Sequence, residues 1–163
     1  MRSRDVPTYE APADLPRRIK VLLDKSTVGS KNLCMGIYIL MPGQRSPVDV
    51  HPDMEEAHYV VRGRGSLVLG RERYEIHGGD AAYIGPGVSH QCFNTGTGEL
   101  RFIWVFTPHP AEYRFLKDKW KRVETSRKRV KVGRVLSKRR ERRRKQPYPK
   151  RYYASSYASP RQA

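Results

Sequence analysis

Short runs of β-branched, aromatic and other apolar residues recur between residues 18 and 108, and turn-forming residues separate them. The strand-like runs are 19–23, 33–41, 58–61, 66–69, 74–76, 81–84 and 102–106. Segments such as Gly78-Gly79-Asp80 and Gly85-Pro86-Gly87 break the runs at short, even intervals. Alternation and composition of this kind are typical of β-strands. The pattern predicts an all-β fold, an antiparallel sandwich or barrel.

The segments on either side of these runs have a different character. Residues 1–17 contain three prolines among polar residues, which predicts an extended N-terminal arm without a regular element. After Pro110 the spacing of Leu116, Trp120 and Val123 becomes helical. We therefore expect a short helix to close a domain that spans residues 18–123.

The C-terminal part of the chain carries almost all of the net charge of +17. Residues 117–163 contain 19 Lys and Arg residues against three acidic ones, and few apolar residues lie between them. Repulsion between the clustered charges predicts a disordered tail over residues 124–163. One interpretation is nonspecific nucleic-acid binding, with tyrosines of the tail stacking on bases. The other is a solvated appendage without a partner.

Other classes of protein are excluded by composition. The chain has two cysteines, Cys34 and Cys92, and no Cys-x-x-Cys spacing, so neither a disulfide framework nor a zinc finger is expected. Both cysteines are expected to be small buried hydrophobes. The longest apolar stretch, residues 33–41, is too short to cross a bilayer, so we expect a cytoplasmic protein that does not bind membranes.

Histidines and carboxylates gather in the middle of the predicted strands. Asp49 and His51 are two residues apart, as are Glu56 and His58, and residues two apart share a face of a strand. His90 follows the next glycine-rich turn. If these faces line a barrel, their side chains converge on one point. Imidazoles with a carboxylate suit a divalent transition metal, and two His with one carboxylate leave coordination positions open for substrate or oxygen.

The order and spacing of these residues resemble the two motifs of the cupin family, G-x5-H-x-H-x(3,4)-E-x6-G and G-x5-P-x-G-x2-H-x3-N. The first motif is approximated by Gly43, Asp49, His51, Glu56 and Gly63, and the second by Gly79, Gly87, His90 and Asn94. The resemblance covers about residues 18–108. It implies a double-stranded β-helix of the jelly-roll kind, with metal ligands at His51, Glu56 and His90.

The sequence departs from the cupin motifs at two positions. Asp49 stands where the family has its leading histidine, and the proline of the second motif is shifted by one place to Pro86. Asp49 is then either an oxygen ligand or an acceptor that orients a ligand imidazole. His58 either supplies the missing imidazole or forms part of the cavity wall.

The resemblance implies an enzyme that uses a divalent metal, Fe, Mn, Ni or Zn, on a small oxygen-bearing substrate such as a carboxylate, a sugar or a polyketide-like molecule. Similar cupins include dioxygenases, decarboxylases, isomerases and lyases. The alternative is a cupin that binds a small ligand without turnover, with the basic tail tethering it to nucleic acid. Single-domain cupins commonly pair, so a homodimer is expected.

Several neighbouring residues have ordinary structural interpretations. Glu55 precedes Glu56 and should face outward into solvent. Arg45 is expected to be a solvated charge or to meet a substrate carboxylate at the barrel mouth. Four aromatic residues are expected to serve in packing: Tyr38, Tyr83, Trp104 and Phe106.

Overall fold

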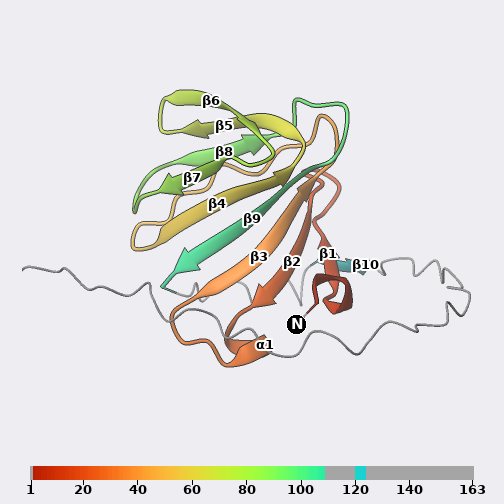
Figure 1. The fold of residues 1–163 in the computed structure, drawn as a ribbon, viewed down its shortest axis with the longest axis vertical. Helices are drawn as coiled ribbons and strands as arrows, with labels where there is room; N and C mark the ends of the chain where they lie inside the picture. The colour runs from red at the N-terminus through yellow and green to blue at the C-terminus, as the bar shows by residue number, and fades with distance from the viewer. Residues whose placement is uncertain (1, 109–119, 124–163) are drawn as a thin grey trace, which may run out of the picture. The chain divides into compact units, whose positions relative to one another are not determined.

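The computed structural model describes residues 2–108 and 120–123, and most of the regular structure in them is β-strand (Figure 1). The strands are β1 Thr8–Glu10, β2 Arg18–Leu23, β3 Cys34–Leu40, β4 Glu55–Arg62, β5 Arg64–Leu69, β6 Glu72–His77, β7 Ala81–Ile84, β8 His90–Phe93, β9 Leu100–Thr107 and β10 Lys121–Val123. A 3-10 turn η1 (Ser3–Asp5) and one turn of helix α1 (Lys25–Val28) complete the described elements. The all-β prediction is confirmed. No helix in this part of the chain has both the length and the apolar character needed to span a membrane.

The strands form two antiparallel sheets. The larger sheet has the order β10-β1-β2-β3-β9-β4-β7, and the smaller one has the order β6-β5-β8 (Figure 1). Neighbours in the sheets are often far apart in the sequence: β9 lies between β3 and β4 and pairs with both. Such crossed connections between two facing sheets are those of a jelly roll, as predicted.

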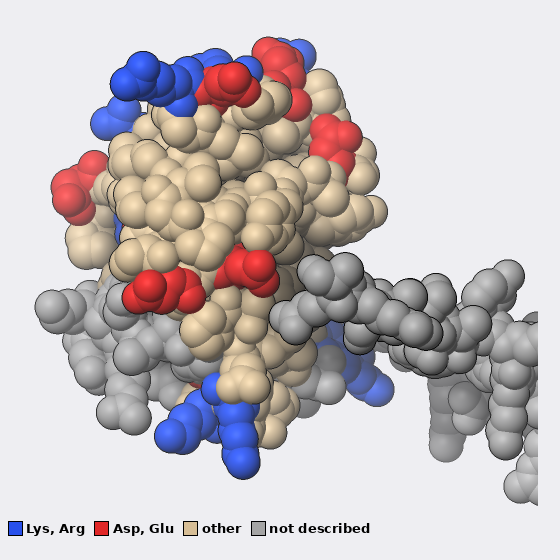
Figure 2. Space-filling view, turned by 90° about the vertical axis from the view of Figure 1, so that its left-hand side faces the viewer, with Lys and Arg blue, Asp and Glu red and all other residues tan. Residues whose placement is uncertain are grey.

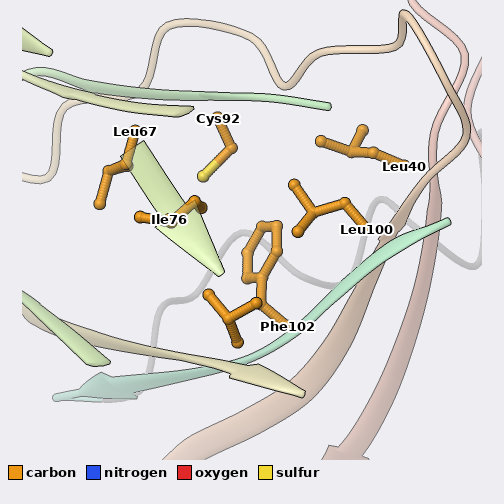
Figure 3. Packing of buried hydrophobic residues seen from close by; sticks show 7 residues of the cluster. Leu40, Leu67, Ile76, Cys92, Leu100 and Phe102 are labelled. Carbon is orange, nitrogen blue, oxygen red and sulfur yellow. The ribbon is translucent and has the colours of Figure 1, made fainter. Parts of the chain in front are cut away.

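A hydrophobic cluster joins the two sheets (Figure 3). The smaller sheet contributes Leu67, Ile76 and Cys92, and the larger sheet contributes Leu40, Val60, Leu100 and Phe102. On β9 burial alternates strictly, because every second residue from Leu100 to Phe106 faces inward. The interior between the sheets therefore has a defined face on each strand, and this face determines which side chains can meet.

The N-terminal segment differs from the prediction of an arm without regular structure. Residues Thr8–Glu10 form β1, which pairs with β2 on one side and β10 on the other. Tyr9 lies opposite Ile19 and packs against a second hydrophobic cluster, which contains Ile19 and Trp120. The prolines lie outside this short strand, so they do not interrupt its pairing.

The prediction of a closing helix is wrong at the C-terminal end of that helix. Lys121–Val123 is strand β10, paired with Thr8–Glu10. Trp120, assigned to the helix by its spacing, is buried in the cluster with Ala11 and Cys34. The rest of the expected helix and the whole of the basic tail lie outside the described residues.

Candidate metal centre between the sheets

Two of the predicted site residues come from the inward face of β4. Glu56 and His58 are buried, while Glu55 and Ala57 between and beside them are exposed. The exposed Glu55 accepts a hydrogen bond of 2.9 Å from the hydroxyl of Tyr83 on the outer face. Alternation along one strand thus separates the two adjacent glutamates, as the sequence predicted.

The other three residues meet where the segment before β4 runs along β8. Asp49 and His90 exchange both backbone hydrogen bonds, each 2.9 Å long. His51 follows two residues later, and its carbonyl accepts a 2.8 Å hydrogen bond from the amide of Gly87 in the turn before His90. Ligand atoms of Asp49, His51 and His90 all lie within 4.8 Å of one another. The described residues therefore contain a three-residue group of the size that holds a metal ion.

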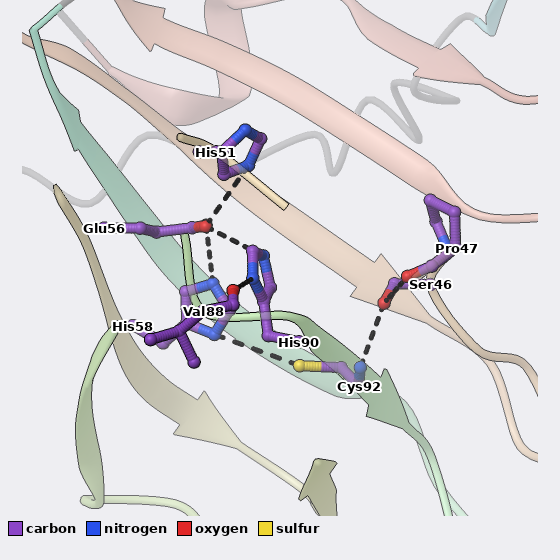
Figure 4. A network of polar contacts seen from close by, with 8 residues as sticks. All are labelled: Ser46, Pro47, His51, Glu56, His58, Val88, His90 and Cys92. Atoms are coloured by element: carbon purple, nitrogen blue, oxygen red, sulfur yellow. Dashed lines mark hydrogen bonds and ion pairs between the residues drawn. The ribbon is translucent and has the colours of Figure 1, made fainter. Parts of the chain in front are cut away.

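The carboxylate of Glu56 lies beside this group and contacts three imidazoles (Figure 4). Its Oε1 accepts a 2.6 Å hydrogen bond from Nε2 of His58. Its Oε2 lies 3.0 Å from Nε2 of His90 and 3.7 Å from Nε2 of His51. The structure thus brings the predicted site residues together: Glu56 contacts the three imidazoles, and Asp49 lies with two of them, His51 and His90.

The environment shifts the pKa values of the acidic and basic groups in opposite senses. Burial raises the pKa of Glu56, but hydrogen bonds from His58 and His90 outweigh it and lower that pKa to about 2. Burial lowers the pKa of His90, but the hydrogen bond to Glu56 and the nearby negative charges outweigh it and raise that pKa above its usual value. Burial also raises the pKa of Asp49, against the opposing effect of the two imidazoles. An ionised Glu56 beside a positively charged His90 is therefore the favoured state of this pair of side chains.

The tautomer of His90 explains why a cation fits. Its Nδ1 donates to the carbonyl of Val88 at 3.1 Å, so a neutral ring presents a lone pair at Nε2. That lone pair faces Oε2 of Glu56, which is buried and lies 3.0 Å away. Two electron-rich atoms at this separation repel each other unless a proton or a metal ion is shared between them. The donor set of imidazoles and carboxylates therefore fits a divalent transition metal.

His58 has a different position from the other two imidazoles. Its Nε2 is used by Glu56, its Nδ1 lies 3.9 Å from Sγ of Cys92, and its ring packs on Phe102 with 4.7 Å between centroids. It does not belong to the three-residue group formed by Asp49, His51 and His90. Its observed contacts orient Glu56.

The two cysteines are buried and unpaired, as predicted. Burial raises the pKa of the Cys34 thiol to about 12, and it raises the pKa of Cys92 further. Neither thiol is therefore activated as a nucleophile. Arg45 is exposed, in agreement with a solvated charge.

The four aromatic residues interpreted as packing do not behave alike. Trp104 and Phe106 are buried in the second cluster, whereas the side chain of Tyr83 is 63% exposed. Tyr38 stacks on Phe102 but also buries a hydroxyl group that has no hydrogen-bond partner among the described residues. Sequence reasoning missed this hydroxyl and the buried Nε of Arg17. Alternation along β3 places Tyr38 on the inward face, but nothing in the sequence indicates that its hydroxyl lacks a partner.

Comparison with known proteins gives the same family as the motifs. The family model of the cupin domain matches residues 36–106, which include every residue of the candidate metal centre. The polyketide synthase CurC of Streptomyces cyaneus is 32% identical over 110 residues, which cover 66% of this chain and 71% of that protein.

Solved structures share the fold. The crystal structure of a predicted oxalate decarboxylase from Thermotoga maritima is 25% identical, with a TM-score of 0.60, and the match covers 66% of this chain and 96% of that one. The polyketide cyclase RemF from Streptomyces resistomycificus is also 25% identical, with a TM-score of 0.57, covering 66% of this chain and 77% of that one. Motifs, topology and relatives agree, and the chain belongs to the cupin superfamily.

Proposed function

We propose that this protein is a metal-dependent cupin enzyme that acts on a small oxygen-bearing molecule bound between the two sheets. The observation that carries the proposal is the convergence of Asp49, His51 and His90, with ligand atoms within 4.8 Å, beside the buried carboxylate of Glu56. The similarity to CurC, to RemF and to a predicted oxalate decarboxylase supports an enzyme rather than a structural protein.

In this proposal His51, His90 and Glu56 hold the ion, and Asp49 supplies an oxygen ligand where other cupins have a histidine. His58 orients Glu56 through the 2.6 Å hydrogen bond between them. When bound by these residues, Fe, Mn, Ni or Zn would supply Lewis-acid or oxygen chemistry.

The chain's own residues prepare the site for this chemistry. The carbonyl of Val88 fixes the ring of His90 so that Nε2 faces inward. The apolar walls, which include Phe102 and Phe106, limit the access of water and so strengthen electrostatic interactions within the site. Glu56 remains ionised at neutral pH because its pKa is about 2.

A substrate screen with a matched pair of variants tests the proposal. Purified protein is saturated with the metal ion that copurifies with it and is then incubated with oxalate, simple sugars or aromatic polyketide analogues. We expect turnover of one class, which a chelator and Glu56→Gln abolish and Glu55→Gln preserves, because the two glutamates face opposite sides of β4. Ligand binding without turnover, equally dependent on Glu56, would favour the alternative of a non-catalytic binding protein.

The charge of the tail supports a second candidate function, attachment to nucleic acid. Residues 1–108 carry 13 Lys and Arg against 12 acidic residues, so this part of the chain has almost no net charge. Figure 2 shows acidic and basic side chains together on one face of the described residues, without a continuous basic surface. Any nonspecific binding of nucleic acid would then depend on residues 124–163.

The outer face of β4, β7 and β9 supports the expected homodimer. Its apolar side chains line a cleft of about 440 Å³: Ala57, Tyr59, Ala81, Tyr83, Ile103 and Val105. The side chains of Tyr59 and Tyr83 are 49% and 63% exposed, and Glu55 beside them is already hydrogen-bonded. A neutral surface that alternates large and small side chains suits a second copy of itself better than the basic tail.

A further inference from the structure

The hydroxyl group of Tyr38 on β3 and Nε of Arg17, one residue before β2, are buried hydrogen-bond donors without a partner among the described residues. The hydroxyl group of Thr8 on β1 is a third such donor. A buried donor without an acceptor costs about 1–3 kcal/mol, so native structures contain few of them. Buried donors of this kind indicate that an acceptor belongs near them.

Tyr38 points into the interior that holds the candidate metal centre. On β3 it lies opposite Ile19 of β2 and Phe102 of β9, both of which are buried. Its ring stacks on Phe102, with 5.0 Å between centroids and an angle of 8°. Phe102 in turn contacts His58. A continuous row of rings therefore connects Tyr38 with the residue that orients Glu56.

Arg17 shares the inward face of the sheet with Tyr38. Its carbonyl accepts a 2.9 Å hydrogen bond from the amide of Ala11, which extends the pairing of β1 with β2 by one residue. Ala11 belongs to the interior cluster, and Arg17 lies two residues before the inward-facing Ile19. Register thus places Arg17 diagonally across from Tyr38.

Contacts of the guanidinium fix its orientation. Cζ lies 4.6 Å from the centre of the Trp120 ring, and Nη1 donates to the carbonyl of Leu15 at 2.8 Å. Stacking on an aromatic face together with one fixed hydrogen bond holds the plane of the group, and Nε has no partner in the part of the chain that the structure describes. The side chain is therefore preorganised before any ligand arrives.

The charge of Arg17 acts on the hydroxyl group of Tyr38. Burial raises the pKa of Tyr38 and Asp49 raises it further, while Arg17 opposes both effects. The positive charge of Arg17 therefore favours a negatively charged oxygen at Tyr38.

We propose that Arg17 and Tyr38 form a subsite for an anionic oxygen of the substrate, a carboxylate or an enolate. This inference rests on the proposed function, because it names the class of substrate presented to the candidate metal centre. The Nε–H of Arg17 and the hydroxyl of Tyr38 donate to that oxygen, and the positive charge offsets repulsion from Asp49 and Glu56. The aromatic rings favour a planar, apolar body behind the anionic group.

Calorimetric titration of the full chain, as purified with its metal, tests the subsite with three probes. Benzoate carries a carboxylate, 4-nitrophenolate represents an enolate, and benzamide is the neutral counterpart of benzoate. We expect one of the anions to bind and benzamide to bind at least tenfold more weakly. Arg17→Gln and Tyr38→Phe should each weaken the anion by about tenfold to a hundredfold, the effect of losing a hydrogen bond to a charged group.

Matched controls separate the subsite from general effects. Arg18→Gln removes the neighbouring charge, which pairs with Glu10 on the other face, and should leave binding unchanged. Tyr38→Phe keeps the ring and its stacking, so it tests the hydroxyl even if Arg17→Gln loses stability. The metal content of each variant is measured on the same sample and should equal that of the parent.

These measurements distinguish failure of the subsite from failure of the proposed function. Unchanged anion affinity in both variants, equal loss in Arg18→Gln, or a parent that binds neither anion overturns the subsite. A parent without metal that still binds an anion through Arg17 and Tyr38 overturns the proposed function but not the subsite. A parent that contains metal and binds an anion equally well without Arg17 and Tyr38 overturns the subsite but not the proposed function.

Discussion

Gly36 on β3 is the position where a single added methyl group should damage the barrel most. It lies opposite Trp104 of β9 and Val21 of β2. A Cβ at this position would lie 2.2 Å from Cζ2 of Trp104 and 2.3 Å from the carbonyl oxygen of Lys20. Ordinary carbon contacts are about 3.5 Å, so the indole would have to move by more than about 1 Å.

Neither neighbour of Gly36 can yield easily. Trp104 is only 1% exposed and packs on Phe106, with 5.2 Å between ring centroids. The carbonyl of Lys20 is part of a strand that is paired on both sides. We therefore expect Gly36→Ala to cost about 3 kcal/mol, at the upper end of the usual effect of overpacking. For a domain of this size the midpoint of thermal unfolding should fall by roughly 10 °C or more.

Thermal and urea unfolding followed by far-UV circular dichroism measures this effect, with Gly98→Ala as the matched control. A Cβ at Gly98 would meet no atom within 4 Å, so that variant should stay within about 1 kcal/mol of the parent. A Gly36→Ala protein that melts within about 2 °C of the parent would refute the close packing of β3 against Trp104.

Three further predictions concern the site, the outer face and the tail. Protons compete with metal for His90, whose pKa is raised, so metal affinity should fall as the pH drops from 8 to 6, and the fall should begin at a higher pH than for an ordinary imidazole. Constant affinity in a competition titration at pH 8, 7 and 6 would contradict this. Tyr83→Glu places a charge on the exposed face of β7, so light scattering should show the mass of a dimer for the parent and of a monomer for the variant, and a dimeric variant would exclude this face. A chain that ends at Glu124 should keep its cooperative thermal unfolding but lose nucleic-acid binding. In the full chain this binding should weaken roughly a thousandfold between about 50 and 200 mM salt. Binding that survives truncation would exclude the tail as the nucleic-acid-binding segment.

Local patterns predicted the strands and the candidate site well, because both depend on residues close together in sequence. Alternation on β4 separates Glu55 from Glu56, and the motif spacing predicted that the side chains of His51, Glu56 and His90 converge, as they do. The strength of these signals comes from the period of two along a strand, which assigns each side chain to a face.

Features that depend on distant pairing could not be predicted. β1 is only three residues long and pairs with the distant strand β10, so that Thr8 lies opposite Val123. No local signal in either segment indicates this partner, and helical spacing around Trp120 suggested a different element. The unpartnered hydroxyl of Tyr38 is likewise a property of its surroundings and not of the residue type.

Elemental analysis of the protein tests the central claim most directly, on material purified without a His tag and without added metal. We expect close to one transition-metal ion per chain in the parent, and a sharp loss in His51→Ala and His90→Ala, because the ligand atoms of these residues lie within 4.8 Å of each other. His77→Ala, which removes an exposed imidazole, should retain the metal of the parent. Metal content that stays the same in the His51 and His90 variants, or a parent without metal that binds none when Fe, Mn, Ni or Zn is supplied, would contradict the account.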